Sequence, residues 1–357
     1  MVKQTKAKLR RAIDAIDGKI VSLLNHRARH AMEIGKLKSK TGEDIYIPDR
    51  EKKIISGILT ENKGPLPKKY LINIFSEILN SARSLQSKLK ISYLGPPATF
   101  THQAAVRKFG RYCDFIPAKT IRDVFIEVEK GRADYGVVPI ENSAEGVISH
   151  TLDMFIESDL AICSEMNMAI EHCLLSREIE IKKIKKVYSH PQALGQCRNY
   201  LEANLADAEI IETSSTASAA DIAGRNRKTA AIASSVAAEP YGLKIVVRGI
   251  EDAHENYTRF LVVGHQSVER SGYDKTSVMF SIKDRVGALH DMLAPFRRYR
   301  INLTKIESRP TRKRAWEYIF FIDFLGHIAD RKIRQALEEL KKQCVFLKVL
   351  GSYPRAE

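Results

Sequence analysis

The chain has 357 residues, of which 44% are hydrophobic and 28% charged, a composition typical of soluble globular proteins with two or three domains. No apolar run of about twenty residues is present, which excludes a transmembrane helix, and five scattered cysteines without a C-x-x-C pair argue against a zinc site or disulfide framework and favour a reducing cytoplasm. Most of the net charge of +15 lies in residues 1–90, which hold 20 Lys and Arg against 9 Asp and Glu but few aromatic residues, so we expect a site for small anions rather than for nucleic acid.

Residues 7–88 are predicted to be helical. The first helix is predicted from an apolar stripe with spacings of three and four, formed by Leu9, Ile13, Ile16, Ile20 and Leu23. Pro48 opens a second helix, the segment 63–67 ends it, and residues 71–85 carry a third stripe. Three helices of this length form only a thin core, so we expect a second copy of the chain to pair with this segment.

Cationic side chains in this segment have a spacing that favours a site shared between two helices. Arg27 and Lys38 are eleven residues apart, which places them within about 20° of the same helix face. Arg10 lies seventeen residues before Arg27, about 25 Å along one helix, so only an antiparallel partner helix can bring both arginines to one small ligand. Gln86 is predicted on the inner face of the third helix. If a helical dimer brings these cations and the amide together, they suit a small dianion. The alternative is that they are ordinary solvated charges on helix faces.

The stretches "LRRAIDAIDGKIVSLLNHR", "IGKLK", "PDRE" and "SLQ" resemble the all-α chorismate mutase domain. The resemblance implies a helical domain at residues 1–89 in which Arg10 of the partner chain and Arg27 hold the two carboxylates of chorismate. It also implies that Lys38 and Gln86 flank the ether oxygen, and that Glu51 binds the ring hydroxyl with support from Arg50. A pericyclic rearrangement to prephenate needs a compact conformer and donors near the breaking C–O bond, and no nucleophile.

After residue 90, short apolar strands alternate with helices, which predicts an α/β sheet with sites at the strand ends. Strand signals lie at residues 91–94, 135–140, 186–188 and 229–233, and the region is long enough for two lobes with a cleft between them. Polar side chains follow several strands, at residues 99–102, 141–143, 189–192 and 256–260. Each group alone also fits a helix cap or a turn. No G-x-S-x-G elbow accompanies Ser189 and His190, which argues against a serine hydrolase.

Five ordered stretches, "YLGPPATFTHQA", "GVVPIENSAEG", "YSHPQALGQC", "TSSTASAA" and "ENYTRF", resemble prephenate dehydratase. The resemblance implies a two-lobed α/β domain at residues 90–266, similar to periplasmic binding proteins, whose closure excludes water. It implies that Thr258 protonates the leaving ring hydroxyl of prephenate. Groups that bind or orient the substrate would be Glu141, Asn142, Ser189, Gln196 and Thr216. Aromatisation drives the loss of water and CO2, so no metal or cofactor is implied.

Residues 266–275 are polar and are predicted to be a linker, and the remaining residues follow the order strand, helix, strand, strand, helix, strand of an α+β ferredoxin-like domain. Within them, "DRVGALHDML" and "KIESRP" resemble the ACT regulatory domain. The resemblance implies an ACT domain at residues 275–357 that binds phenylalanine between two copies. The ligand would lie against Gly287, Ala288, Leu289, Glu307, Ser308 and Arg309, because Gly287 leaves backbone N–H groups at a helix start free for a carboxylate.

Together these resemblances imply a cytoplasmic bifunctional enzyme of phenylalanine biosynthesis that converts chorismate to prephenate and then to phenylpyruvate. We expect L-phenylalanine to inhibit it, and we expect a homodimer or larger homo-oligomer without cofactor, metal, nucleic acid or membrane partner. One alternative is a dehydratase that prefers arogenate. Another is a non-catalytic amino-acid sensor or solute-binding module, which would show no turnover.

Overall fold

The computed structural model describes residues 5–144, 146–253, 255–282, 285–310 and 318–356. The chain forms two compact units, the first made of Met1–Leu89 and Phe109–Asp114 and the second of Lys90–Lys108 and Phe115–Glu357. Across the described ranges, no helix is long and apolar enough to span a bilayer. All five cysteines are free thiols.

The first unit is built from three helices, as the sequence predicts: α1 (Lys6–Thr41), α2 (Pro48–Glu61) and α3 (Lys68–Ser84). The side chain of Thr5 accepts a hydrogen bond from the backbone N–H of Lys8 and so caps the start of α1. Gly42 ends this helix with φ 71°, a left-handed conformation that costs glycine little. Pro48 stands in the first turn of α2, where its missing N–H is not needed.

The end of α3 differs from the prediction. This helix ends at Ser84, and the backbone N–H of Gln86 donates to the carbonyl of Arg83 at 2.9 Å in a tighter turn. Gln86 therefore lies beyond the helix, and its placement on the third helix was wrong.

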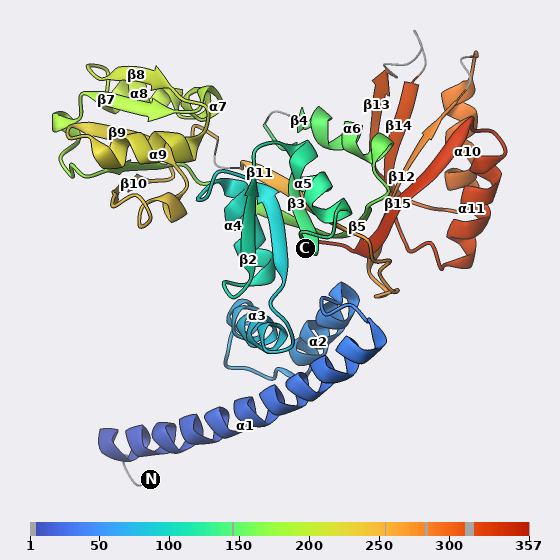
Figure 1. The fold of residues 1–357 in the computed structure, drawn as a ribbon, viewed down its shortest axis with the longest axis horizontal. Helices are drawn as coiled ribbons and strands as arrows, with labels where there is room; N and C mark the ends of the chain where they lie inside the picture. The colour runs from blue at the N-terminus through green and yellow to red at the C-terminus, as the bar shows by residue number, and fades with distance from the viewer. Residues whose placement is uncertain (1–4, 145, 254, 283–284, 311–317, 357) are drawn as a thin grey trace. The chain divides into compact units, whose positions relative to one another are not determined.

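The apolar stripe of α1 is uncovered in the single chain. Its five members are between 46% and 69% exposed, and Figure 1 shows α1 as one continuous helix. A contiguous apolar stripe of this length is typical of a surface that pairs with another helix.

The first sheet of the second unit has the strand order β2-β1-β3-β11-β5, with β4 paired to β3. Its strands are β1 (Lys90–Leu94), β2 (Asp114–Ala118), β3 (Tyr135–Asn142), β4 (Gly146–Val147), β5 (Ala161–Ala169) and β11 (Tyr257–Gly264). Helix α4 (Phe100–Phe109) joins β1 to β2. Helices α5 (Ile121–Glu129) and α6 (Ser149–Glu157) pack together through Phe125 and Phe155, whose ring centroids are 5.3 Å apart. The strand of this sheet that comes last in chain order, β11, is thus inserted between β3 and β5.

The second sheet has the order β10-β6-β9-β7-β8 and forms the other lobe. Its strands are β6 (Cys173–Ser176), β7 (Lys186–Ser189), β8 (Glu209–Glu212), β9 (Thr229–Ala233) and β10 (Lys244–Arg248). Its helices are α7 (Pro191–Gln196), α8 (Arg198–Asn204) and α9 (Thr216–Arg225), with short 3₁₀ turns at Ile181–Lys183 and Ser235–Ala237. The chain enters this lobe after β5 and returns to the first sheet at β11, which confirms the two-lobed α/β fold.

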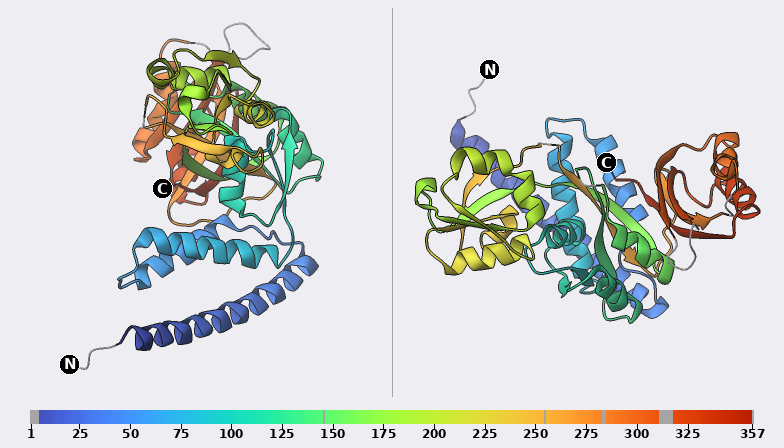
Figure 2. Two further views of the ribbon diagram at one scale, coloured as in Figure 1. Left: turned by 90° about the vertical axis from the view of Figure 1, so that its left-hand side faces the viewer. Right: turned by 90° about the horizontal axis from the view of Figure 1, so that it is seen from above.

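The third sheet, β13-β14-β12-β15, confirms the ferredoxin-like order. Its elements are β12 (Asp274–Ser281), α10 (Ala288–Arg298), β13 (Leu303–Pro310), β14 (Tyr318–Leu325), α11 (Arg331–Lys341) and β15 (Phe346–Pro354). Helices α10 and α11 cover one face, where Phe280, Phe296 and Phe324 form the core, and Figure 2 shows both helices on the same side. On the other face β15 lies close to β5. A Cβ on Gly351 would be only 2.3 Å from the carbonyl oxygen of Ile162, so a residue without a side chain is needed there.

Candidate active sites

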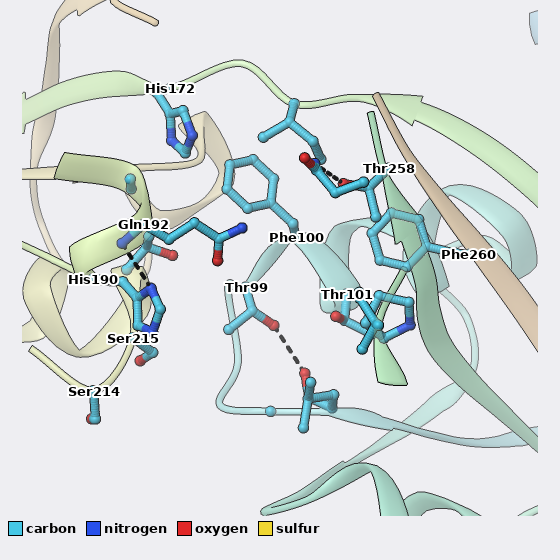
Figure 3. Close-up of a pocket in the computed structure, with 18 of the residues that line it drawn as sticks. Thr99, Phe100, Thr101, His172, His190, Gln192, Ser214, Ser215, Thr258 and Phe260 are labelled. Carbon is cyan, nitrogen blue, oxygen red and sulfur yellow. Dashed lines mark hydrogen bonds between the residues drawn. The ribbon is translucent and has the colours of Figure 1, made fainter. Parts of the chain in front are cut away.

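A cavity of 360 Å³ lies between the two lobes of the second unit. The first lobe contributes the start of α4, the end of β3 and the start of β11, including Thr101, Asn142 and Thr258. The second lobe contributes α7 and the start of α9, including Gln196 and Thr216. Figure 3 shows Thr258 and Phe260 on one side of the cavity and His172, His190 and Gln192 on the other. The cavity lies at strand ends and between lobes, as the sequence predicts.

A series of side-chain hydrogen bonds runs behind Thr258. Asn142 Nδ2 donates to Thr258 Oγ1 and to Asn256 Oδ1, both at 2.8 Å. Asn256 Nδ2 donates to Gln196 Oε1 at 3.1 Å, and His172 Nε2 lies 2.8 Å from the same oxygen. The backbone N–H of Ala144 donates to Asn142 Oδ1 at 2.9 Å. Four polar side chains thus support a threonine that is only 7% exposed.

His172 stands at the far end of this series and is 2% exposed. Burial lowers its pKa, which the hydrogen bond with Gln196 and the charge of Glu251 only partly oppose. Its Nδ1 atom is buried without a hydrogen-bond partner among the described residues. The ring is therefore neutral in the neutral pH range.

Three of the predicted dehydratase residues besides Thr258 line the cavity, namely Asn142, Gln196 and Thr216, and two do not. Glu141 precedes Asn142 on β3, so its side chain points to the opposite face, where its Oε2 binds Lys305 Nζ at 2.7 Å. Ser189 is fully buried, and its hydroxyl donates to the carbonyl of Ile232 at 2.6 Å. The prediction that Glu141 and Ser189 line the cleft was wrong in this structure.

The predicted site residues did not include Asn256, which lay in the polar stretch 256–260, nor His172 and Lys119, both of which line the cavity. A signal for Asn256 was present, because it precedes Thr258 by two residues and alternate residues of an extended chain share a face. No signal pointed to His172, whose role depends on a contact with Gln196 from a distant part of the sequence.

In the first unit, Lys38 and Glu51 lie in one polar cluster. Lys38 is 9% exposed, and its Nζ donates to the carbonyl of Asp44 at 2.6 Å. Burial lowers the pKa of Lys38, opposed by the charges of Glu43, Asp44 and Glu51. A nearly buried ammonium beside a carboxylate is suited to binding an anion that also carries a hydroxyl.

Arg83, which the sequence reasoning missed, holds Glu51. Its Nη1 lies 3.1 Å from Glu51 Oε1, it donates to Asn80 Oδ1, and it is 4% exposed. The guanidinium lies over the rings of Tyr46 and Phe109, 5.0 and 5.6 Å from their centroids. Arg83 follows Leu79 by four residues on α3, and a charge inside an apolar stripe was the available signal.

Gln86 packs against α1 next to Lys38. A Cβ on Gly35 would lie 2.9 Å from Cα and Cβ of Gln86, so the absence of a side chain at Gly35 permits this approach. Lys38 lies three residues later, on the same face of α1. Gln86 Oε1 is buried without a hydrogen-bond partner in the described chain, and its Nε2 makes only a 3.5 Å contact to the carbonyl of Ala82.

Of the three predicted arginines of this site, Arg10 lies far from Lys38 in the same chain. Arg27 is half-buried on α1, whereas Arg10 and Arg50 are exposed. Arg10 and Lys38 lie on the same continuous helix, so they are separated by about 40 Å at 1.5 Å per residue. One chain therefore cannot bring Arg10 to the cluster around Lys38.

In the third sheet, Gly287, Ala288 and Leu289 line a cavity of 270 Å³. Gly287 has φ 77° and is the N-cap residue of α10, and the N–H groups of the first turn of a helix have no acceptor within the helix. Glu307, Ser308 and Arg309 lie on β13, which is the edge strand of the sheet, and they are not among the residues that line this cavity. The single chain does not bring the two predicted halves of the phenylalanine site together.

The strand that carries Thr258, β11, is linked to the third sheet by charged side chains. Arg259 follows Thr258 and points to the opposite face, where it binds Glu165 at 2.8 Å, Asp323 at 2.6 Å and the Tyr353 hydroxyl at 3.1 Å. Burial alone would lower the pKa of Arg259, but Tyr353, Asp323 and Glu165 together hold it above its ordinary value. Lys305 on β13 binds Glu141, the neighbour of Asn142. The two strands that carry Asn142 and Thr258 are thus both joined to this sheet.

Comparison with known proteins agrees with this division of the chain. Models of chorismate mutase type II, prephenate dehydratase and the ACT domain match residues 9–87, 91–268 and 276–342. The chain is 50% identical to a bifunctional chorismate mutase/prephenate dehydratase of Aquifex aeolicus over 98% of this chain and 97% of that protein. It is 43% identical to the protein of the same description from Pseudomonas aeruginosa, over 99% and 98%.

The solved structure of a prephenate dehydratase from Arthrobacter aurescens in complex with L-Phe is also similar, with a TM-score of 0.69 and 34% identity over 75% of this chain and 90% of that chain. The chain therefore belongs to the family of bifunctional chorismate mutase/prephenate dehydratases, with an isomerase domain, a lyase domain and an ACT domain.

Proposed function

We propose that this enzyme, which converts chorismate to prephenate and prephenate to phenylpyruvate, carries out the two reactions at the two separate clusters described above. The mutase domain would span residues 1–89, the dehydratase domain 90–266 and the ACT domain 275–357. Neither site needs a cofactor in this scheme. Five free thiols and the lack of a membrane-spanning helix in the described residues are compatible with action in the cytoplasm.

For the mutase reaction, Lys38 and Gln86 would donate to the ether oxygen of chorismate as the C–O bond breaks. Negative charge gathers on that oxygen in the transition state, and a nearly buried ammonium stabilises it more strongly than water does. Glu51, held by Arg83, would accept the ring hydroxyl proton in a hydrogen bond, with Arg50 beside it. Gly35 supports this assignment because the absence of a side chain there lets Gln86 approach α1 three residues before Lys38.

The two carboxylates of chorismate need cations that one chain does not assemble. Arg27 would bind one carboxylate and Arg10 of a second chain the other. The distance of about 40 Å between Arg10 and Lys38 along α1 supports a composite site. The uncovered apolar stripe of α1 supports an antiparallel homodimer as the smallest active assembly.

For the dehydratase reaction, Thr258 would protonate the leaving hydroxyl of prephenate. The ring carboxylate leaves as CO2, the electrons of its C–C bond complete the aromatic ring, and the ring C–O bond breaks. The leaving oxygen takes the Thr258 proton to form water, and solvent restores the hydroxyl afterwards. Asn142 Nδ2, 2.8 Å from Thr258 Oγ1, stabilises the negative charge that develops on this oxygen. Lys119, Gln196 and Thr216 would bind the substrate.

Phenylalanine would bind at paired ACT domains, between Gly287, Ala288 and Leu289 of one chain and Glu307, Ser308 and Arg309 of the other. The edge position of β13 supports pairing at this strand. The bonds from Lys305 to Glu141 and from Asp323 to Arg259 give the ACT domain direct contacts to β3 and β11. A ligand that changes the arrangement of paired ACT domains would change the position of Asn142 and Thr258 through these bonds.

The bond between Asn142 and Thr258 in the cavity is the observation that carries the proposal. The experiment is to incubate the purified chain with chorismate and to follow prephenate and phenylpyruvate separately. Prephenate should appear first and phenylpyruvate second, and turnover of arogenate in a parallel assay should be lower. Faster turnover of arogenate would assign the second site to that substrate, and absence of any turnover would leave only a binding function.

A further inference from the structure

The hydrogen-bond series behind Thr258 has a direction that a single backbone group determines. The N–H of Ala144 can only donate, so the atom of Asn142 that it contacts must be the carbonyl oxygen Oδ1. The other amide atom of Asn142 is then Nδ2, whose two hydrogens point to Thr258 Oγ1 and to Asn256. Asn256 must therefore present its oxygen to Asn142.

The same reasoning continues across the lobes. Because Asn256 Oδ1 accepts from Asn142, its Nδ2 faces Gln196 and the Gln196 atom there must be the oxygen Oε1. That oxygen also lies 2.8 Å from His172 Nε2, so Nε2 must carry a hydrogen. His172 is therefore the Nε2–H tautomer, and the orphan atom Nδ1 is its unprotonated nitrogen.

This direction decides what Thr258 can do. A hydroxyl has one hydrogen to donate. Thr258 does not donate this hydrogen to Asn142, because its oxygen is the acceptor in that hydrogen bond. Within the described residues, Thr258 Oγ1 donates to no group, and the side chain lines the cavity. If Asn142 were turned over, its oxygen would take the Thr258 hydrogen and the N–H of Ala144 would lose its acceptor.

We propose that Asn256 and His172 are positioning residues of the dehydratase, which together with the Ala144 N–H lock Asn142 as a donor and leave the Thr258 proton free for the leaving hydroxyl. The proposal rests on the assignment of Thr258 as the acid. Asn256 does not line the cavity, so its contribution passes through Asn142 and Gln196. The Nε2–H of His172, in the tautomer that this direction requires, is the donor at the opposite end from Ala144.

The first test is the tautomer of His172 in the full-length chain. Nitrogen NMR of histidine-labelled protein should show His172 as a neutral ring with hydrogen on Nε2, and the signal is assigned by its loss in His172→Gln. A ring with hydrogen on Nδ1, or a charged ring, would overturn the proposed direction. This measurement does not depend on activity, so it separates the proposal from the acid assignment.

The second test compares His172→Gln with His172→Leu in the full-length chain. Glutamine can place an N–H near the position of Nε2, whereas leucine cannot donate. We expect His172→Leu to lower dehydratase kcat on the order of tenfold or more, with a smaller change in KM, and His172→Gln to retain most of kcat. An equal loss of dehydratase kcat in both variants, with unchanged mutase turnover and thermal unfolding, would mean that the N–H donor at position 172 has no role. If instead Thr258→Ala keeps dehydratase activity, the acid assignment itself fails, whatever the His172 variants show.

Discussion

The dehydratase cavity and the mutase cluster differ in how much of the site one chain supplies. Thr258, Asn142, Asn256, Gln196 and His172 all belong to one unit and are joined by hydrogen bonds of 2.8–3.1 Å. The predicted mutase site around Lys38, Glu51 and Gln86 also needs Arg10, which lies about 40 Å along α1 from Lys38 in the same chain. Under the proposed scheme, one polypeptide contains a dehydratase site that it supplies by itself and a mutase site that association with a second chain completes.

Thr258→Ala should give the largest effect and should separate the two regions. Loss of a general acid typically costs about 10²- to 10⁴-fold in rate, so phenylpyruvate formation should nearly cease. Mutase turnover should remain normal because Lys38 and Glu51 belong to the other unit. Both steps are measured on the same preparation. Thr258→Ser, which keeps the hydroxyl, is the matched control, and substantial activity in Thr258→Ala would refute the acid assignment.

Lys38→Ala should affect only the mutase, by about 3–4 kcal/mol of transition-state stabilisation if it acts like one oxyanion donor. The wild-type rate should also depend on pH, because only the protonated amine donates as a cation. Burial lowers the Lys38 pKa below its ordinary 10.5, so mutase activity should fall as pH rises through a value below that of free lysine. In Lys38→Gln the amide still donates, and this alkaline fall should disappear. A fall that persists in Lys38→Gln would assign it to another group.

Arg10→Ala and Arg27→Ala test the composite site directly. Each variant alone should be inactive as a mutase and active as a dehydratase. After mixing and subunit exchange, half of the dimers are mixed and each has one intact site, so about a quarter of the sites should recover. Exchange is verified by mass-tagged subunits. Complete exchange without recovery would place both arginines in the site of one chain.

The smallest effect is expected at the contact between the ACT domain and β3. Lys305→Ala removes the partner of Glu141. It should raise the inhibition constant of phenylalanine by roughly fivefold at most, since single ion pairs contribute up to about 1 kcal/mol. Lys183→Ala, which removes an exposed pair with Glu180 at 2.6 Å, is the control. By reciprocity, an inert prephenate analogue must weaken phenylalanine binding by the factor that phenylalanine weakens analogue binding. Calorimetry that finds equal phenylalanine affinities despite clear inhibition would exclude binding coupling.

Periodicity predicted the helices of the first unit and the βαββαβ order of the third sheet, because both depend on contacts close in sequence. Resemblance predicted Thr258, Asn142 and Gln196, which the structure brings to one cavity. It also placed Ser189 and Glu141 there. In the structure the Ser189 hydroxyl donates to a backbone carbonyl, and Glu141, next to Asn142 on β3, faces the ACT domain. Arg83 and His172 were missed because their partners, Glu51 and Gln196, lie on other elements, and only the fold brings such groups together.

The two covalent connections between the dehydratase lobes have a mechanical consequence. The chain leaves β5 and returns to β11 side by side, and the backbone N–H of Ile170 donates to the carbonyl of Asn256 at 2.8 Å. Any rotation of one lobe against the other must bend at this pair of crossings, and atoms near the axis of a rotation travel least. Asn256 and His172 lie at these crossings, close to the axis of any such rotation, so they would move least. A rotation of the lobes that opened the cavity about this axis would leave the groups that orient Thr258 almost still.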